Sequence, residues 1–238
     1  MKSKLYGIGV GPGDSEYLTI KGKRIINEVD ILLCPIKSLT SESFAFNIIK
    51  EHIENEKLEI VNLLYPMVYD ENELENMWQK NGEIINSYLE KKKNIAFITL
   101  GDTTVYSTFM YTLPYINKAL MELEIIPGIT SFCAVASEIQ QPLMLWEESL
   151  KIIPVRKNDK NQLNEAIKNN ENLVLMKPSN NPIEIIKMLK ENNLEDKFML
   201  ISKVGTDDEM LIRDIKTLEN EKLPYLSTII IKKGGFNV

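Results

Sequence analysis

The stretch that decides the fold is Leu5-Tyr-Gly-Ile-Gly-Val-Gly-Pro-Gly-Asp-Ser-Glu-Tyr-Leu-Thr19, in which glycine occupies alternate positions from residue 7 to residue 13. An apolar segment leads into this loop, and residues 19–29 then have the pattern of a helix. Glycine allows a backbone to take positive φ angles and to approach a ligand closely. A loop at the carboxyl end of a first parallel strand is where open α/β sheets bind small molecules. The stretch therefore predicts an α/β fold that begins with strand, loop and helix.

Two phosphate-binding motifs do not fit this loop. A dinucleotide fingerprint requires Gly-x-Gly-x-x-Gly, but its third glycine position holds Pro12 when the motif starts at Gly7. The same position holds Asp14 when the motif starts at Gly9. A P-loop ends in Gly-Lys-Ser or Gly-Lys-Thr, and neither tripeptide follows. A tight turn without a ligand therefore remains an alternative to a binding loop.

The composition is ordinary for a globular protein. The chain has 238 residues, of which 44% are hydrophobic and 26% charged, so it can form one large or two small domains. A net charge of −6 argues against a nucleic-acid-binding surface. Cys34 and Cys133 are isolated thiols, which fits a reducing cytoplasm. The sequence has neither a signal-peptide core nor a run of about 18 apolar residues, so we expect no membrane span.

Two further strand ends in the first half of the chain carry small polar loops. Residues 95–100 have the pattern of a buried strand that ends in Gly101 and Asp102. Another strand ends at Pro127 and Gly128, before a helix of small residues that starts at residue 130 or 131. Because parallel strands end at one edge of a sheet, we expect the three loops to converge on a binding site. The Asp102 carboxylate either contacts a ligand or caps the next helix.

The pattern of strands divides the chain near residue 140. Predicted strands at residues 30–35 and 58–64 complete a mostly parallel sheet, so residues 1–140 form an N-terminal α/β domain with the Gly-rich loop. Residues 141–238 form a C-terminal α/β domain with a mixed sheet. Its predicted strands lie at 150–155, 173–177, 197–202, 209–213 and 227–232, and its predicted helices at 160–169 and 182–193.

Three motifs, taken in order, resemble those of the tetrapyrrole methyltransferases, a family that methylates corrinoid precursors with S-adenosylmethionine. Residues 7–14, completed by Leu18 and Thr19, match the family's Gly-x-Gly-x-Gly-Pro-Gly-Asp loop. Residues 101–108 match Gly-Asp-Pro-x-x-Tyr-Ser-Thr, with Thr103 in place of the proline. Residues 127–131 match the family's Pro-Gly motif. The resemblance covers essentially the whole chain.

Within the family, the sequence most resembles the subgroup that methylates C20 of precorrin-2 or of cobalt-precorrin-2. The stretches that carry this similarity are 65–70 with Leu74 and Trp78, 175–177, 202–205 with Glu209, and 224–227. The resemblance implies S-adenosylmethionine-dependent C20 methylation that gives precorrin-3 or its cobalt complex, in cobalamin biosynthesis. Methylation at another ring position of the pathway is the first alternative. A nucleotide-cofactor oxidoreductase and a non-catalytic corrinoid-binding protein are the others.

The resemblance also implies a fold and a site. Its fold is two α/β domains with a ligand cleft between them, in a homodimer. Asp102 and Tyr106 are the candidate catalytic residues, although no general base is identified. The implied S-adenosylmethionine contacts are Pro12, Leu100, Gly101, Asp102, Val105, Thr130, Ser131, Met176 and Val204.

The remaining expectations concern metal and charge. His52 is the only histidine and the two cysteines are isolated, so we expect no protein-bound metal, and cobalt enters only within the substrate. A tetrapyrrole substrate with eight carboxylates needs cations. The lysines and the arginine near predicted strand ends are Lys37, Arg156, Lys177 and Lys203, and the sequence does not choose among them.

Overall fold

A computed structural model describes residues 2–68, 70–157 and 160–236. The chain divides into two compact units, Met1–Thr130 and Ser131–Val238. The division therefore falls earlier than the boundary near residue 140 that the sequence indicates. The reason is helix α5 (Ser131–Glu138), which packs against strand β10 (Ser227–Lys232) and so belongs to the second unit.

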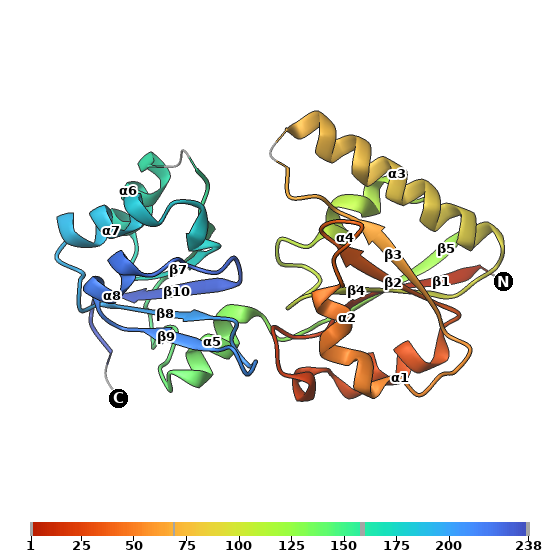
Figure 1. The fold of residues 1–238 in the computed structure, drawn as a ribbon, viewed down its shortest axis with the longest axis horizontal. Coiled ribbons are helices and arrows are strands. Elements are labelled where there is room, and N and C mark those ends of the chain that lie inside the picture. The colour runs from red at the N-terminus through yellow and green to blue at the C-terminus, as the bar shows by residue number, and fades with distance from the viewer. Residues whose placement is uncertain (1, 69, 158–159, 237–238) are drawn as a thin grey trace. The chain divides into compact units, whose positions relative to one another are not determined.

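The first unit is built on a five-stranded sheet in the order β3-β2-β4-β1-β5, in which all the strand pairs are parallel (Figure 1). In this sheet Ile8 lies between Ile98 and Ile126 of the neighbouring strands. The parallel sheet confirms the predicted fold class of the N-terminal part. The strands are β1 (Ser3–Gly9), β2 (Ile31–Ile36), β3 (Glu59–Leu64), β4 (Ile95–Thr99) and β5 (Met121–Ile126).

Helices cover both faces of this sheet, because successive side chains of a buried strand point to opposite faces. One hydrophobic cluster joins Ile8 and Ile98 to α1 and α2. The other joins Leu5 and Phe97 to α3 and α4. The α-helices are α1 (Ile20–Glu28), α2 (Phe44–Ile49), α3 (Glu71–Glu90) and α4 (Thr108–Thr112), and the 3-10 helices are η1 (Ser15–Tyr17), η2 (Lys50–His52) and η3 (Leu113–Tyr115).

The second unit has a mixed sheet in the order β6-β7-β10-β8-β9, as the sequence predicts. Strands β6 and β7 are parallel, and the other pairs are antiparallel. The strands are β6 (Leu150–Pro154), β7 (Asn172–Met176), β8 (Phe198–Ser202), β9 (Met210–Ile212) and β10. Helices α6 (Lys160–Asn169), α7 (Pro182–Glu191) and the short α8 (Ile215–Asn220) share one hydrophobic cluster with this sheet, and η4 (Pro178–Asn180) follows β7.

A buried lysine holds the segment that follows α5. Lys232 is only 3% exposed, and its Nζ donates a hydrogen bond of 2.8 Å to the Pro142 carbonyl. The same Nζ lies 3.7 Å from a Glu148 carboxylate oxygen. The segment between α5 and β6 is therefore attached to the centre of the second sheet, although it has no regular secondary structure.

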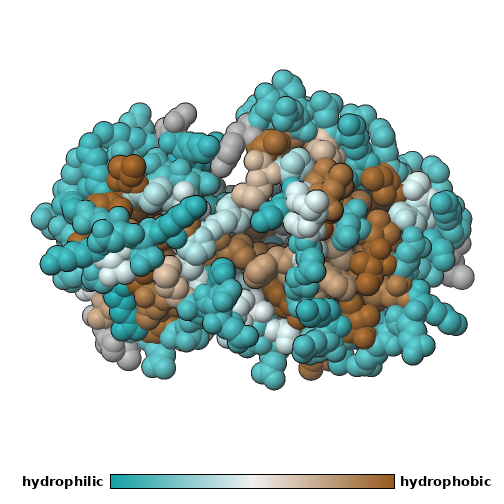
Figure 2. Space-filling model, in the orientation of Figure 1, coloured by the Kyte–Doolittle hydropathy of each residue, from teal (hydrophilic) through white to brown (hydrophobic). Residues whose placement is uncertain are grey.

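The visible surface is largely hydrophilic, and hydrophobic side chains appear on it in separate groups (Figure 2). Within the described part of the chain, every helix is too short or too polar to span a bilayer.

Backbone contacts bring together the carboxyl ends of β1, β4 and β5. A Cβ atom built on Gly9 would lie 2.6 Å from the Gly101 carbonyl oxygen and 2.7 Å from the Gly128 nitrogen. A Cβ atom on Gly128 would overlap the Gly101 carbonyl and would lie 2.7 Å from the Gly9 carbonyl carbon. These strand ends can approach so closely only because both positions lack a side chain.

The Gly128→Ala variant tests this contact. We expect a loss of about 1–3 kcal/mol in the free energy of unfolding, because the new methyl group must displace backbone atoms. Gly234→Ala is the matched control, since nothing lies within 4 Å of a Cβ atom there. Urea denaturation measures both variants, and equal midpoints would contradict the contact.

Candidate active site

The Gly-rich loop and the loop after β4 are joined through their backbones. The Gly11 amide donates to the Gly101 carbonyl at 3.2 Å, and the Gly101 amide donates to the Gly11 carbonyl at 2.8 Å. This bridge places Pro12 on one loop beside the Gly101 end of the other. The convergence that the sequence predicts for these two loops is therefore present.

Asp102 links the loop after β4 to the loop after β5. One carboxylate oxygen accepts from the Thr104 amide at 2.8 Å and from the Thr104 hydroxyl. The other accepts from the Gly128 amide at 2.8 Å. Burial disfavours the charged carboxylate, but these hydrogen bonds outweigh it and lower the pKa of Asp102 below its ordinary value. The carboxylate is thus ionised and fully engaged in holding the two loops.

Asp102 does not cap the following helix, so that one of the two predicted roles of its carboxylate is wrong. Ser107 caps α4, because its hydroxyl accepts from the Phe109 amide at 3.2 Å. Asp102 lies too far upstream for this contact and instead closes the turn to Thr104. The alternative, that the Asp102 carboxylate contacts a ligand, stays a prediction.

Thr103, which stands where the resembling motif has proline, is completely buried. Its Oγ1 accepts from the Thr99 hydroxyl at 3.3 Å and donates to the Ile126 carbonyl at 3.4 Å. It therefore adds a side-chain link between β4 and β5. The sequence indicates the exchange of proline for threonine, but it contains no signal for these partners.

Tyr106 has an unusual backbone conformation for a residue with a bulky side chain. Its φ angle is +48°, and its side chain is 41% exposed. Such left-handed residues cost free energy, and they are frequent at functional sites. Val105, the neighbouring predicted contact, is half-buried. The loop from Asp102 to Ser107 thus presents one tyrosine ring to the surface.

Thr130 carries a buried polar atom without a partner. Its Oγ1 is shielded from solvent and makes no hydrogen bond in the described part of the chain. The next residue differs, because the Ser131 hydroxyl lies 3.2 Å from the Thr228 hydroxyl. A buried hydroxyl without a hydrogen bond is costly, so Thr130 Oγ1 fits a position that a ligand atom satisfies.

The other predicted contacts lie at strand ends of the second unit. Met176 ends β7 and is half-buried, and Val204 follows β8 and is buried. Of the four candidate cations, Lys37 and Arg156 are exposed, whereas Lys177 and Lys203 are partly buried at the ends of β7 and β8.

The stretch from residue 65 to Trp78 packs against α4, although residue 69 lies outside the described residues. The Tyr65 hydroxyl lies 2.8 Å from the Thr112 hydroxyl, and burial raises the pKa of Tyr65 above its ordinary value. The Trp78 and Tyr111 rings stack with their centroids 5.1 Å apart. The subgroup-like stretch therefore adjoins the helix that follows the Asp102 loop.

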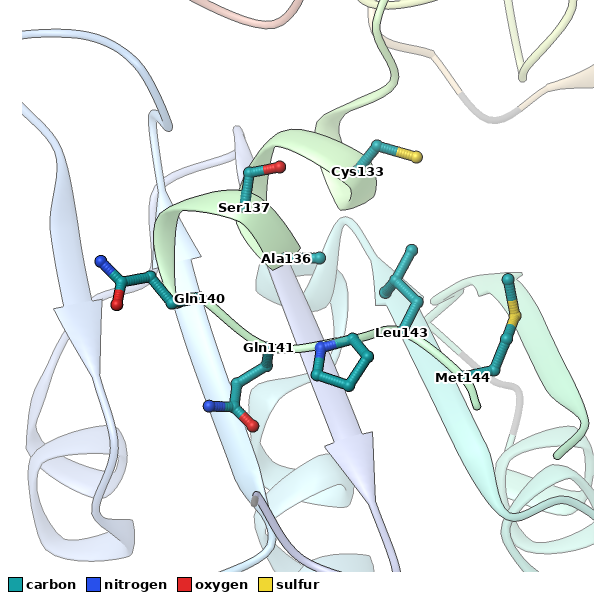
Figure 3. A pocket seen from close by; sticks show the side chains of 8 residues that line it. Cys133, Ala136, Ser137, Gln140, Gln141, Leu143 and Met144 are labelled. Atoms are coloured by element: carbon teal, nitrogen blue, oxygen red, sulfur yellow. The ribbon is translucent and has the colours of Figure 1, made fainter. Parts of the chain in front are cut away.

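Two surface hollows lie away from these predicted contacts. One, of about 400 Å³, is formed in the second unit by α5 and the segment that follows it, and Figure 3 shows Cys133, Ser137, Leu143 and Met144 around it. The other, of about 580 Å³, lies at the amino ends of β1 and β4, opposite the loop edge. None of the predicted cofactor contacts lines either hollow. The structure of the described residues also contains no group of three or more metal-ligating side chains.

The sequence matches the tetrapyrrole (corrin/porphyrin) methylases over residues 4–219. The chain belongs to this family. It is 30% identical to the cobalt-precorrin-2 C(20)-methyltransferase of Salmonella typhimurium over 234 residues, which are 98% of each chain. It is 32% identical to a probable cobalt-precorrin-2 C(20)-methyltransferase of Methanocaldococcus jannaschii, over 97% of this chain and 96% of that one.

Solved structures show the same fold. A cobalt precorrin-4 methyltransferase superposes with a TM-score of 0.74 at 20% identity, covering 96% of this chain and 94% of that one. The uroporphyrin-III C-methyltransferase of Thermus thermophilus, complexed with S-adenosylhomocysteine, gives a TM-score of 0.69 at 14% identity. That comparison covers 97% of this chain and 98% of the other. The two-sheet α/β fold is thus the fold of the family.

The Asp102→Asn variant tests the carboxylate link. Because folding lowers the pKa of Asp102, the stabilisation is present above the unfolded pKa and is lost as the pH falls through the folded pKa. We expect the wild type to have a higher free energy of unfolding at neutral pH, by a margin that shrinks below about pH 4. Denaturation curves between these pH values measure the margin. Exposed Asp207→Asn is the control, and a margin independent of pH would contradict the link.

Proposed function

We propose that this protein transfers a methyl group from S-adenosylmethionine to C20 of cobalt-precorrin-2, in cobalamin biosynthesis. The observation that carries the proposal is similarity over nearly the full length to two proteins named for this reaction. The three joined loops of the first unit support a methyltransferase of this family. Residues 65–78, which resemble the C20 subgroup, support that ring position over the others.

In this proposal the residues of the chain bind the cofactor and the substrate and align them. The reaction needs little acid–base catalysis from the protein. S-adenosylmethionine carries the methyl group on a sulfonium sulfur. When the C20–methyl bond forms, the sulfur–methyl bond breaks and S-adenosylhomocysteine leaves. The attacking carbon is already electron-rich, and a proton leaves C20 afterwards. Positioning of two reactants can lower the activation free energy by about 7–11 kcal/mol in favourable cases. Rigid loops at three strand ends fit that requirement.

We propose that the cofactor is held by Pro12, Leu100, Gly101, Val105, Thr130 and Ser131, with Met176 and Val204 as further contacts. Thr130 Oγ1 supports this set, because it is a buried acceptor and donor without a protein partner among the described residues. Asp102, whose lowered pKa and engaged oxygens make it a poor base, positions these loops rather than moving a proton. Tyr106 remains the candidate group for contact with the substrate.

A homodimer in the cytoplasm is also part of the proposal. An exposed apolar segment supports a contact with a second copy, since Trp146 is fully exposed and both Met144 and Leu145 are more than 40% exposed. Light scattering measures the mass of the protein in solution, and a monomer would contradict the dimer.

The methyl-transfer assay tests the reaction directly. Purified protein, S-adenosylmethionine and anaerobically prepared precorrin-2, with and without cobalt, are followed by mass spectrometry. We expect a gain of one methyl group, located at C20 by NMR of labelled product, and faster turnover of the cobalt complex. A methyl group at another ring carbon, or cofactor binding without transfer, would contradict the C20 assignment.

The Thr130→Val variant tests the cofactor site. The substitution removes a hydroxyl that has no hydrogen-bond partner among the described residues, so we expect no loss in the free energy of unfolding. We expect binding of S-adenosylmethionine, measured by calorimetry, to weaken by about tenfold, as for one lost hydrogen bond of about 1.4 kcal/mol.

Thr112→Val is the contrasting variant, because the Thr112 hydroxyl is buried and bonded to Tyr65 and to the Thr108 carbonyl. It should lower stability and leave cofactor binding unchanged. If Thr130→Val behaves in the same way as Thr112→Val, Thr130 does not contact the cofactor.

A further inference from the structure

Two lysines of the second unit share an unusual backbone conformation. Lys177 has a φ angle of +56° and Lys203 one of +52°, in the left-handed region that lysine rarely adopts. Lys92, Gln140 and Asn193 also have positive φ, but each follows a helix, where left-handed residues commonly terminate the last turn. Lys177 and Lys203 directly follow strands, so helix termination does not account for them.

The two lysines flank the beginning of the same strand. Strand β10 pairs with β7 on one side and with β8 on the other. The Lys177 amide donates to the Ser227 carbonyl at 3.3 Å, and the Lys203 amide donates to the Leu226 carbonyl at 2.7 Å. Because one strand separates β7 from β8, the two lysine backbones lie about 10 Å apart, which is twice the strand spacing.

Side-chain hydrogen bonds stiffen this edge of the sheet. The hydroxyls of Ser202 and Ser227 lie 2.6 Å apart, and the Ser227 hydroxyl also lies 2.6 Å from the Pro224 carbonyl. The Glu209 carboxylate accepts from the Gly205 amide at 2.8 Å and closes the loop after β8. The two lysine backbones are thus held in place by a network that does not use their ammonium groups.

Each ammonium group has a partner that leaves it available to a further anion. Lys177 Nζ lies 5.5 Å from the centre of the Tyr225 ring, a cation–π contact that leaves room for an anion. Lys203 Nζ lies 2.7 Å from Asp208, whose side chain is 74% exposed. An exposed ion pair of this kind is weak, because water and salt screen it. Asp208 therefore holds Lys203 only weakly.

We propose that Lys177 and Lys203 bind two carboxylates of the tetrapyrrole substrate, and that Asp208 holds Lys203 until a substrate carboxylate replaces it. The identity of the ligand rests on the proposed function, whereas the pair itself rests on the geometry of β7, β8 and β10. A protein with a net charge of −6 needs such local cations to bind a polyanion. Nearby Glu209 is already engaged by the Gly205 amide.

Binding of uroporphyrin, a stable tetrapyrrole with eight carboxylates, tests the pair by fluorescence titration of the full chain. We expect Lys177→Gln and Lys203→Gln each to weaken binding by about fivefold, as for an exposed ion pair. Lys177→Arg and Lys203→Arg should restore most of the affinity. Lys187→Gln on α7 is the control for loss of one positive charge and should bind as the wild type does.

The adjacent aspartates give a sharper test. Asp208→Asn removes the competitor for Lys203, so we expect uroporphyrin binding to tighten by about two- to fivefold. Asp207→Asn makes the same change in net charge one residue away, where the side chain is also exposed, and should have little effect. Equal effects of the two substitutions, or weaker binding by Asp208→Asn, would overturn the proposed exchange.

Binding of S-adenosylmethionine and steady-state kinetics of methyl transfer complete the test. The lysine variants should bind S-adenosylmethionine normally and should raise the KM for the methyl acceptor more than they lower kcat. Normal uroporphyrin binding by both lysine variants would overturn the pair even if the wild type methylates cobalt-precorrin-2. If the wild type methylates neither precorrin, the proposed function fails, but the binding pattern still tests the pair.

Discussion

The site depends on a contact between three backbones. Gly9, Gly101 and Gly128 lie at the ends of β1, β4 and β5, and no side chain separates them. This contact allows the Gly128 amide to reach Asp102. It also allows the Gly11 and Gly101 backbones to form their bridge. Backbone contacts and one carboxylate therefore join the three loops at this edge.

The charged carboxylate of Asp102 holds the loops after β4 and β5 in position. Both carboxylate oxygens of Asp102 accept hydrogen bonds, which favours the ionised form of the group. Burial removes Cys34 from chemistry, because it raises the pKa of the thiol to about 12. Such a site suits a reaction in which the reactants supply the reactivity and the protein supplies alignment.

The sequence predicts the sheets well because their strands are nearly continuous apolar runs. Residues 95–99 form β4 and residues 227–232 form β10, close to their predicted limits. The short helix α8 was missed because it buries only Leu218, which gives no helical periodicity. The division at residues 130–131 differs from the predicted boundary near residue 140, because the small residues of α5 do not reveal in the sequence that they pack on β10.

The sequence predicts where the loops of the site lie, but not which partners their side chains have. The loops around Pro12, Gly101 and Thr130 could be located from their glycines and prolines, because these residues at the end of a strand indicate a loop. The contacts of Asp102 with Gly128 and of Thr103 with Ile126 could not be located, because each joins residues more than 20 positions apart. The sequence does not predict the left-handed backbones of Lys177 and Lys203, because lysine is not a residue type that favours this conformation.

The strand order of the second sheet has a consequence for synthesis on the ribosome. Of the five strands of this sheet, β10 is the last to be synthesised, yet it lies at the centre of the sheet and joins β7 to β8. The first unit is complete at Thr130 and can fold while the rest of the chain is still being made. The second sheet must wait for residues 227–232, so β7, β8 and the apolar side of α5 stay uncovered until those residues have been synthesised. That interval is when the nascent protein most needs protection from aggregation.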